Sequence, residues 1–364
     1  MEGACVANPL QKAVVVRGLI RVVRVGRALV GPDRSDKLTP SRPPVTGGRG
    51  MVRRVVVFAL VLLTLAASGL GVYSLLWPNT TPSRVSEPAF VPSADPLPQT
   101  DAFADLARTD PVGMFDACLA RYSRETKGFR ATLEKQERVA GKVHEREVVR
   151  VVAWGDVPSR PGAEPKPHVR MVWEQGARKD LFGTAVTGSL YVAGENDDQI
   201  VAFRPHALVK SFHQVDVKGS LARGASRYCI RDSGLYRGTL RSYLAWKKLR
   251  DAGDLKTEYL GKQVVAEVGG RECHVVRRVT ARPNADSFAL DEQAATNPKT
   301  VERDGFTEVT VMIDAERWLQ VGTVLKRPDG GLVGEYYFRD IELIPGDLPV
   351  ATFTVDALKA AAKH

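Results

Sequence analysis

The sequence lacks the short motifs that mark the common active sites. Its 364 residues contain no Walker loop, no GxSxG elbow, no HExxH pair and no dinucleotide-binding glycine fingerprint. Only 4 cysteines and 6 histidines are present, without a CxxC pair, and the two residue types do not cluster at the spacing of a zinc site. We therefore predict no catalytic residues, no metal and no cofactor, and we expect a protein that is not an enzyme.

The chain also lacks a basic domain surface, although its formal net charge is +10. Residues 1–54 hold 11 Lys and Arg against 3 Asp and Glu, whereas the remaining residues hold 41 against 39. The basic character therefore belongs to the N-terminal segment, and the rest has the balanced charge of an ordinary globular surface. We predict no binding to nucleic acid.

Charge is absent altogether from residues 55–77. A helix of that length spans a hydrocarbon core of about 30 Å. Arg53 and Arg54 precede the segment, and Tyr73 and Trp77 suit the headgroup region. Because basic residues stay on the cytoplasmic side, we predict a single-pass protein of the cell membrane, with its N-terminus in the cytoplasm and its C-terminal domain in the periplasm or otherwise outside the cytoplasm.

Two features of the N-terminal part stay open. Residues 51–77 are expected to form an uncleaved signal-anchor, and the alternative is a cleaved signal peptide, because small residues follow an apolar stretch. Translation starts at either Met1 or Met51. Residues 1–50 are accordingly a doubtful or disordered basic extension.

Cysteines are few in the predicted domain, and their number there is odd. They are Cys118, Cys229 and Cys273. Outside the cytoplasm two of them can form a disulfide and leave one free thiol, but the spacing does not say which two.

Prolines punctuate the stretch that follows the apolar segment. Six of them lie between residues 78 and 98, a density that disfavours helix and sheet and gives an extended spacer. We predict a Pro-rich linker over residues 78–108 and one domain over residues 109–358.

Two helices are predicted in this domain. Apolar residues recur at three- and four-residue steps over about residues 111–124, where Asp110 suits the N-cap and Pro111 the first helical position. A second apolar stripe predicts a helix over about residues 234–251. Residues 284–304 are polar and are expected to form a long loop.

Strands dominate the rest of the domain. Phe129, Ala131 and Leu133 alternate with polar residues, and Val169, Met171 and Trp173 repeat that pattern. Such a period of two indicates a sheet with one covered face. We predict a mainly β, α+β fold: a curved antiparallel sheet or incomplete β-barrel of about nine to eleven strands, with helices covering one side.

Several short segments, in order along the chain, resemble the bacterial domain-of-unknown-function 1571 family. They are Phe129 to Val139, Leu190 to Val192 with Asn196-Asp197, Gly219 to Gly224 continuing to Gly234-Leu235, Gly269 to Arg271 with Cys273, Val311 to Asp314, and Gly334 to Phe338 with Asp340. The resemblance covers roughly residues 112–355. Ala131 stands where the family often has Cys, which puts in doubt a family disulfide between the first strand and Cys273.

The resemblance implies a fold similar to the periplasmic lipoprotein carriers, an incomplete barrel with a helical lid over an apolar concavity. In those carriers the concavity holds lipoprotein acyl chains. The family itself has no established activity, so a function inferred from the fold is an analogy.

Seven residues are the candidates for ligand binding. Aromatic and apolar side chains on alternating strands either fill a core or line a cavity, and arginines in the segment after residue 219 either grip an anionic group or pair with nearby carboxylates. The candidates are Met171, Trp173, Leu190, Arg223, Arg227, Tyr336 and Phe338.

The sequence thus predicts a membrane-anchored binding protein for a lipid, a lipoprotein acyl chain or another hydrophobic ligand. Its expected partners are the membrane, through residues 55–77, and that ligand or lipoprotein. The alternative is an envelope scaffold or protein-interaction domain whose barrel is filled by side chains. A dry apolar concavity of several hundred Å³ distinguishes the first reading from the second.

Overall fold

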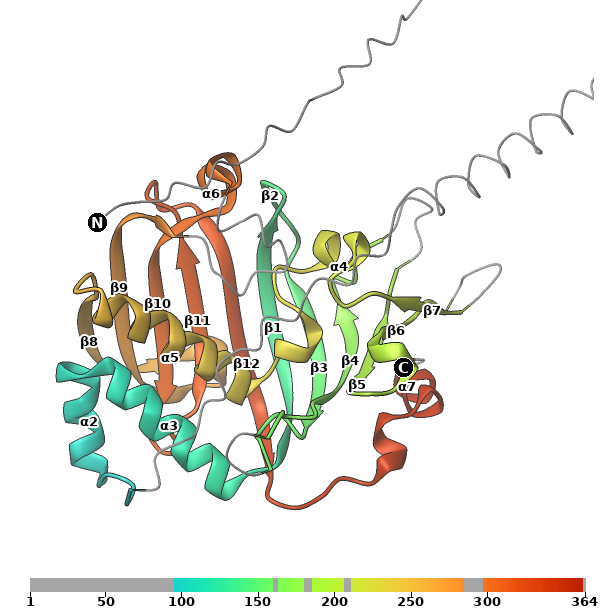
Figure 1. The fold of residues 1–364 in the computed structure, drawn as a ribbon, viewed down its shortest axis with the longest axis horizontal. Helices are drawn as coiled ribbons and strands as arrows, with labels where there is room; N and C mark the ends of the chain where they lie inside the picture. The colour runs from blue at the N-terminus through green and yellow to red at the C-terminus, as the bar shows by residue number, and fades with distance from the viewer. Residues whose placement is uncertain (1–94, 160–162, 180–184, 206–210, 285–296, 363–364) are drawn as a thin grey trace, which may run out of the picture. The chain divides into compact units, whose positions relative to one another are not determined.

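The computed structural model describes residues 95–159, 163–179, 185–205, 211–284 and 297–362. Twelve antiparallel strands in this part form one curved sheet, in the order β7-β6-β5-β4-β3-β1-β12-β11-β10-β9-β8 with β2 paired to β1 (Figure 1). The strands are β1 (Gly128–Val139), β2 (Lys142–Val143), β3 (Glu147–Trp154), β4 (His168–Gln175), β5 (Gly188–Val192), β6 (Ile200–Phe203), β7 (Phe212–Val215), β8 (Lys256–Val265), β9 (Arg271–Asn284), β10 (Phe306–Asp314), β11 (Gln320–Lys326) and β12 (Leu332–Ile344). Strands β7 and β8 are the two edges, so the sheet is open, as predicted.

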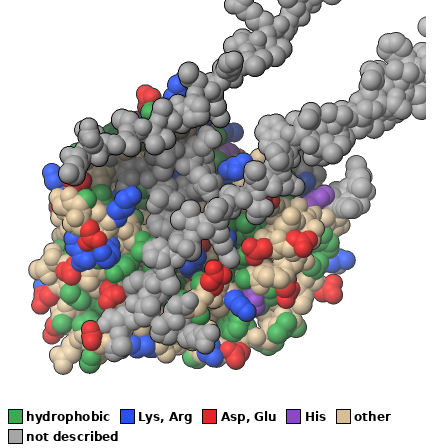
Figure 2. Space-filling view, viewed as in Figure 1, with side chains coloured by type: hydrophobic (Ala, Val, Ile, Leu, Met, Phe, Trp, Pro, Cys, Tyr) green, Lys and Arg blue, Asp and Glu red, His purple; other side chains and the backbone are tan. Residues whose placement is uncertain are grey.

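Six α-helices and several short 3₁₀ segments accompany the sheet within the described residues. The helices are α2 (Thr100–Thr109), α3 (Pro111–Glu125), α4 (Ser220–Ala225), α5 (Leu235–Asp251), α6 (Pro298–Asp304) and α7 (Val355–Ala361), and the 3₁₀ segments used below are η2 (Ile230–Asp232), η3 (Ala266–Val268) and η5 (Val350–Phe353). On the face visible in Figure 2, acidic and basic side chains are interspersed.

Strand β1 lies in the middle of the sheet, between β3 and β12. Its predicted alternation is confirmed, because Phe129, Ala131 and Leu133 are buried while Arg130 is exposed. Leu133 is opposite Val149 of β3 on one side and Phe338 of β12 on the other. Side chains of a strand alternate between its two faces, so β1 directs this apolar set toward the covered inner face.

Helices α2, α3 and α5 pack on the inner face of the sheet (Figure 1). Both predicted helices are confirmed, as α3 and α5. The Asp110 carboxylate accepts a hydrogen bond from the Gly113 backbone N–H at 3.0 Å, which caps α3. Phe115 of α3 packs edge-on against Trp246 of α5, with ring centroids 5.0 Å apart. These contacts fix α5 relative to the strands.

The outer face of strands β3 to β6 is covered by the C-terminal segment. Phe353 of η5 and Leu358 of α7 are buried there against Val152, Val172 and Leu190. The prediction that helices cover one side is therefore incomplete, because α7 covers the opposite face. The sequence pattern of α7 was too short to predict a helix, because α7 has only 7 residues.

Two helices occur where the sequence predicted none. Helix α2 falls within the predicted linker, and its Phe103 is buried and stacks on Trp318 with centroids 4.3 Å apart. Helix α6 falls within the predicted loop, where Asn297 caps it and Pro298 occupies the first turn. The cap and proline were visible in the sequence, but the low apolar content around them masked the helix.

The three domain cysteines are free and buried. The structure therefore contains no disulfide among Cys118, Cys229 and Cys273, a pairing that the sequence left open. Burial raises the pKa of the Cys229 and Cys273 thiols to about 12, so both stay protonated.

The predicted localisation requires a correction. No helix in the described residues is long and apolar enough to cross a membrane. The longest of them, α5, has 17 residues and carries several Arg and Lys side chains. The prediction of a single-pass membrane protein is contradicted by this finding. The predicted extension 1–50, the segment 55–77 and most of the linker lie outside the described residues.

Candidate functional site: a cavity between the sheet and helix α5

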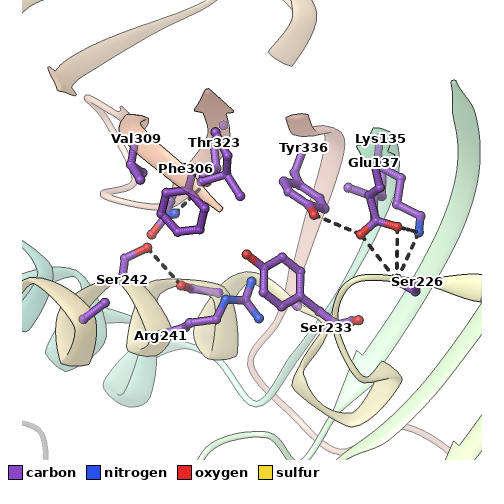
Figure 3. Close-up of a pocket in the computed structure, with 18 of the residues that line it drawn as sticks. Lys135, Glu137, Ser226, Ser233, Arg241, Ser242, Phe306, Val309, Thr323 and Tyr336 are labelled. Atoms are coloured by element: carbon purple, nitrogen blue, oxygen red, sulfur yellow. Dashed lines mark hydrogen bonds and ion pairs between the residues drawn. The ribbon is translucent and has the colours of Figure 1, made fainter. Parts of the chain in front are cut away.

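A cavity of about 850 Å³ lies between the inner face of the sheet and helix α5. Strands β1, β4, β5 and β6 form one part of its wall, and β9 to β12 form the other. Helix α4 and the chain leading from it to α5 complete the enclosure. Figure 3 shows α5 on one side of this space and the strands that carry Phe306 and Tyr336 on the other.

The sheet side of the cavity is mostly apolar. Period-two alternation brings Leu133, Met171, Ile200 and Phe338 to this face from four strands. Trp173 lies beside Met171 along the same face of β4, and its indole N–H donates to Glu147 at 2.6 Å. The tryptophan thus presents its ring to the cavity while its polar atom is satisfied.

The helix side is lined by both small and large residues, and the small ones lie together. Gly238, Ser242 and Ala245 follow one another at four- and three-residue steps, so they share one face of α5. A Cβ atom added at Gly238 would meet nothing closer than the Arg241 guanidinium, at 4.0 Å. These three positions leave room for the cavity, and Arg241, Trp246, Lys248 and Leu249 of α5 also line it.

A buried cluster of four charges lies at the β1 end of the cavity. The Lys135 ammonium lies 2.8 Å from Glu137 and 3.6 Å from Glu147. Arg178 pairs with Glu147 at 3.0 Å and with Glu137 at 3.5 Å. Lys135, Glu137 and Glu147 are all less than 10% exposed. Two positive and two negative charges leave the cluster neutral, which is the condition for burying it.

Both members of the central pair are charged. Burial alone would lower the pKa of Lys135, but Glu137 and Glu147 outweigh it and raise the pKa. Burial would likewise raise the pKa of Glu137, but Lys135 and Arg178 lower it. The Tyr336 hydroxyl donates to Glu137 at 2.9 Å (Figure 3), and burial raises the pKa of Tyr336. Near neutral pH the cluster is an ammonium, two paired carboxylates, a guanidinium and a protonated phenol.

This arrangement does not favour nucleophilic catalysis. The serine hydroxyl at the cluster belongs to Ser226, 3.4 Å from the Lys135 ammonium and 3.2 Å from Glu137. A serine nucleophile needs a neighbouring base with a free electron pair. The raised pKa keeps Lys135 protonated, and the lowered pKa makes Glu137 a weak base. The cluster is better suited to ordering one end of the cavity than to moving protons.

Four of the seven predicted site residues line the cavity: Met171, Trp173, Tyr336 and Phe338. Leu190 does not, because it points to the outer face and packs with Leu358. Strand β5 is buried along its whole length, so its sequence has no alternation from which the face could be read.

The two predicted arginines also lie outside the cavity lining. Arg223 is exposed on α4, where its guanidinium donates to the backbone carbonyl of Lys218. Arg227 is buried behind the wall, where it donates to the Asp304 carbonyl at 3.1 Å and lies over the Phe306 ring. Both arginines therefore form contacts within the protein: Arg223 with Lys218, and Arg227 with Asp304 and Phe306.

Sequence reasoning missed Lys135 and Glu137. They continue the same alternation as Phe129, Ala131 and Leu133, so the period of β1 already placed them on the inner face. Because both side chains are charged, they were not expected on the buried inner face. Arg241 and Arg278, which also line the cavity, gave no signal, because each lies among other basic residues in the sequence.

Several solved structures are similar to this chain. MucB is 14% identical, with a TM-score of 0.35, over 69% of this chain and 62% of MucB. A putative outer membrane lipoprotein-sorting protein domain from Vibrio parahaemolyticus is 12% identical, with a TM-score of 0.29, over 72% of this chain and 100% of that one. A LolA superfamily protein from Nitrosomonas europaea is 10% identical, with a TM-score of 0.26, over 66% and 98%. This chain thus spans less than two thirds of MucB.

No curated protein matches the sequence significantly. The family described as "Protein of unknown function (DUF1571)" matches residues 126–354. That range runs from the residue after α3 to the end of the segment that precedes α7, and it contains every strand of the sheet. The match covers more than half of the sequence and agrees with the predicted resemblance, and the chain therefore belongs to the DUF1571 family.

Proposed function

We propose that this protein binds a hydrophobic ligand, a lipid or an acyl chain, in the cavity between the sheet and α5. One observation carries the proposal: a space of about 850 Å³ to which the sheet contributes mostly apolar side chains and α5 contributes Gly238, Ser242 and Ala245 among its lining residues. Sites for small organic ligands commonly measure about 300–1,000 Å³ and have mostly apolar walls.

The size and lining of the cavity favour a binding site over a packing defect. Packed interiors contain few voids larger than a water molecule, and this space of about 850 Å³ is partly open to solvent. Water fills it when no ligand is bound, and its apolar wall residues favour replacing that water by an apolar ligand.

The alternative of a scaffold with a filled interior fits the structure less well. In a filled interior, side chains from the sheet and from the helices contact one another, as Phe103 and Trp318 do. They do not meet at Gly238, Ser242 and Ala245. The exposed large apolar residues are scattered singly, for example Leu221 and Val264, and singly exposed apolar residues are common on protein surfaces.

Occupancy of the cavity can be tested with the full chain and a neutral apolar fluorophore, N-phenyl-1-naphthylamine. The dye is expected to brighten on binding and to be displaced by a long-chain alcohol. Gly238→Phe should reduce binding at least tenfold, because the new ring occupies the cavity. Replacing an interior helical glycine also gains up to about 1 kcal/mol of helix propensity, so the variant should fold.

Lys247→Phe is the matched control. It places the same ring on the same helix, at a position whose side chain is 41% exposed and does not line the cavity. This variant should bind the dye as the wild type does. Equal binding by all three proteins, or no binding by any, would reject the proposed function.

A further inference from the structure

The charges that line the cavity do not balance. Five basic residues and two acidic residues contribute to the wall: Lys135, Arg241, Lys248, Lys256 and Arg278 against Glu137 and Asp254. Lys135 and Glu137 pair with each other at 2.8 Å and leave no net charge. Asp254, Lys248 and Lys256 are all exposed, near the end where α5 leads into β8. The remaining wall therefore carries an excess of positive charge.

Arg241 is the cation best placed to meet a ligand. It lines the cavity from α5, next to Ser242 and about one turn from Gly238 and Ala245, and Figure 3 shows its side chain beside the helix. Its guanidinium lies over the Tyr228 ring, 3.9 Å from the centroid. One of its N–H groups donates to the Asp232 backbone carbonyl at 3.3 Å.

No carboxylate among the described residues forms an ion pair with Arg241. The nearest candidate by sequence, the Asp232 side chain, pairs with Arg237 at 2.9 Å and with Arg231 at 3.8 Å. The two cations of the charge cluster, Lys135 and Arg178, differ in this respect, because each lies within 4.0 Å of two carboxylates. Stacking on Tyr228 holds the face of the guanidinium and leaves most of its N–H edge available.

A second polar group on the wall is uncommitted. Gln320 lines the cavity and is 6% exposed, and its amide N–H donates to the Thr323 hydroxyl at 2.7 Å. Its carbonyl oxygen is buried without a hydrogen-bond partner. A buried acceptor of this kind is satisfied by an O–H or N–H group. It therefore suits a donor group of a ligand, and the preference for an anion depends on Arg241 alone.

We propose that the ligand is an anionic amphiphile, whose apolar chain lies against Met171, Trp173 and Phe338 and whose carboxylate or phosphate is held by Arg241. This inference rests on the proposed function and adds the class of ligand. A planar guanidinium binds a carboxylate or phosphate through two parallel hydrogen bonds. The cluster at Lys135 is neutral and therefore adds no comparable preference for an anion.

The test compares ligands that share a tail and differ in the head. Oleate, oleyl phosphate and oleyl alcohol, each below its micelle concentration, compete for the dye on the full chain at pH 8. The two anions should displace it at concentrations roughly ten- to hundredfold lower than the alcohol, as expected for a charge-assisted contact. Inorganic phosphate alone should not displace it, because it lacks the tail.

Arg241→Gln should abolish the preference for the anions and leave displacement by the alcohol unchanged. Arg250→Gln is the control, since Arg250 belongs to the same helix, pairs with Asp110 and Asp251, and does not line the cavity. It should behave as the wild type. If the wild type does not prefer the anions, or if Arg241→Gln keeps the preference, the inference is overturned while dye binding still supports the proposed function. If the dye itself fails to bind, both fall.

Discussion

Strands β3 to β6 are covered on both faces, but the two coverings differ in kind. On the outer face, Leu358 of α7 is fully buried and lies so close to the sheet that a Cβ atom at Gly188 would approach it to 2.8 Å. On the inner face, η2 packs on β4, and Met171, Trp173, Ser189 and Ile200 line a cavity of about 850 Å³ whose other wall includes α5. The same strands therefore support a closed core on one side and a cavity on the other.

The size of the covering side chains makes this difference. Leucine and phenylalanine from the C-terminal segment interdigitate with the valines of the outer face. Helix α5 also buries large residues, including Tyr236, Leu240 and Trp246. Tyr236 packs near Tyr122 of α3, with ring centroids 5.6 Å apart. Gly238, Ser242 and Ala245 of the same helix line the cavity. A second difference is charge, because the four-charge cluster lies on the inner face.

The largest expected effect concerns that cluster. Glu137→Leu leaves the Lys135 ammonium buried with weaker compensation, and breaking a buried pair in this way costs about 3–5 kcal/mol. Guanidinium unfolding at pH 7 measures the loss. The double variant Lys135→Met with Glu137→Gln should recover much of it, because Arg178 and Glu147 remain paired at 3.0 Å. A single variant as stable as the wild type would show that the charges are hydrated rather than buried.

Shortening a side chain on the outer face should lower the stability of the protein and leave ligand binding unchanged. Leu358→Ala removes a fully buried side chain and is expected to lower the free energy of unfolding by about 3 kcal/mol. Dye binding should be unchanged when measured well below the unfolding midpoint, because the inner face keeps its shape. Loss of binding in this folded variant would mean that the two faces are coupled and that the comparison between them fails.

A smaller effect is expected from Asp156, which follows β3 near the start of α5. Its carboxylate is 1% exposed, and neither oxygen has a hydrogen-bond partner in the described structure. Burial raises the pKa of Asp156 to about 7, with Arg237 opposing the shift. A raised carboxyl pKa favours folding at low pH, and this contribution is lost as the pH rises from about 4 to 7.

The wild type should therefore lose about 2 kcal/mol of stability between pH 5 and pH 8 that Asp156→Asn does not lose. Urea unfolding of both proteins at the two pH values measures the difference. Identical pH dependence in the two proteins would show that Asp156 is ionised in the folded state across this range.

The elements that could be predicted from the sequence are those whose residue patterns repeat over a few positions. The alternation in β1, the cap and apolar stripe of α3 and the stripe of α5 each depend on residues a few positions apart, so the open antiparallel sheet and its two main helices could be inferred. Four cavity residues followed from the same patterns. Leu190 was assigned to the wrong face because both faces of β5 are buried, which removes the alternation.

The charge cluster could not be inferred in the same way. Lys135 and Glu137 occupy inward positions of β1, yet burying them is unfavourable unless partners are present. Those partners come from β3, from the segment after β4 and from β12, as Glu147, Arg178 and Tyr336. Their approach depends on the register of the whole sheet. Likewise, the cavity arises from the absence of side-chain volume at Gly238, which carries no apolar signal.

The central claim, that a ligand occupies the inner face, is tested most directly by mass spectrometry of organic extracts from the purified full chain. Wild type and Lys247→Phe should carry an amphiphilic small molecule at about one per chain, and Gly238→Phe should carry less than a tenth of that amount. If the three extracts contain the same molecules in equal amounts, or if none contains such a molecule even after incubation with lipid, the cavity is not a ligand site.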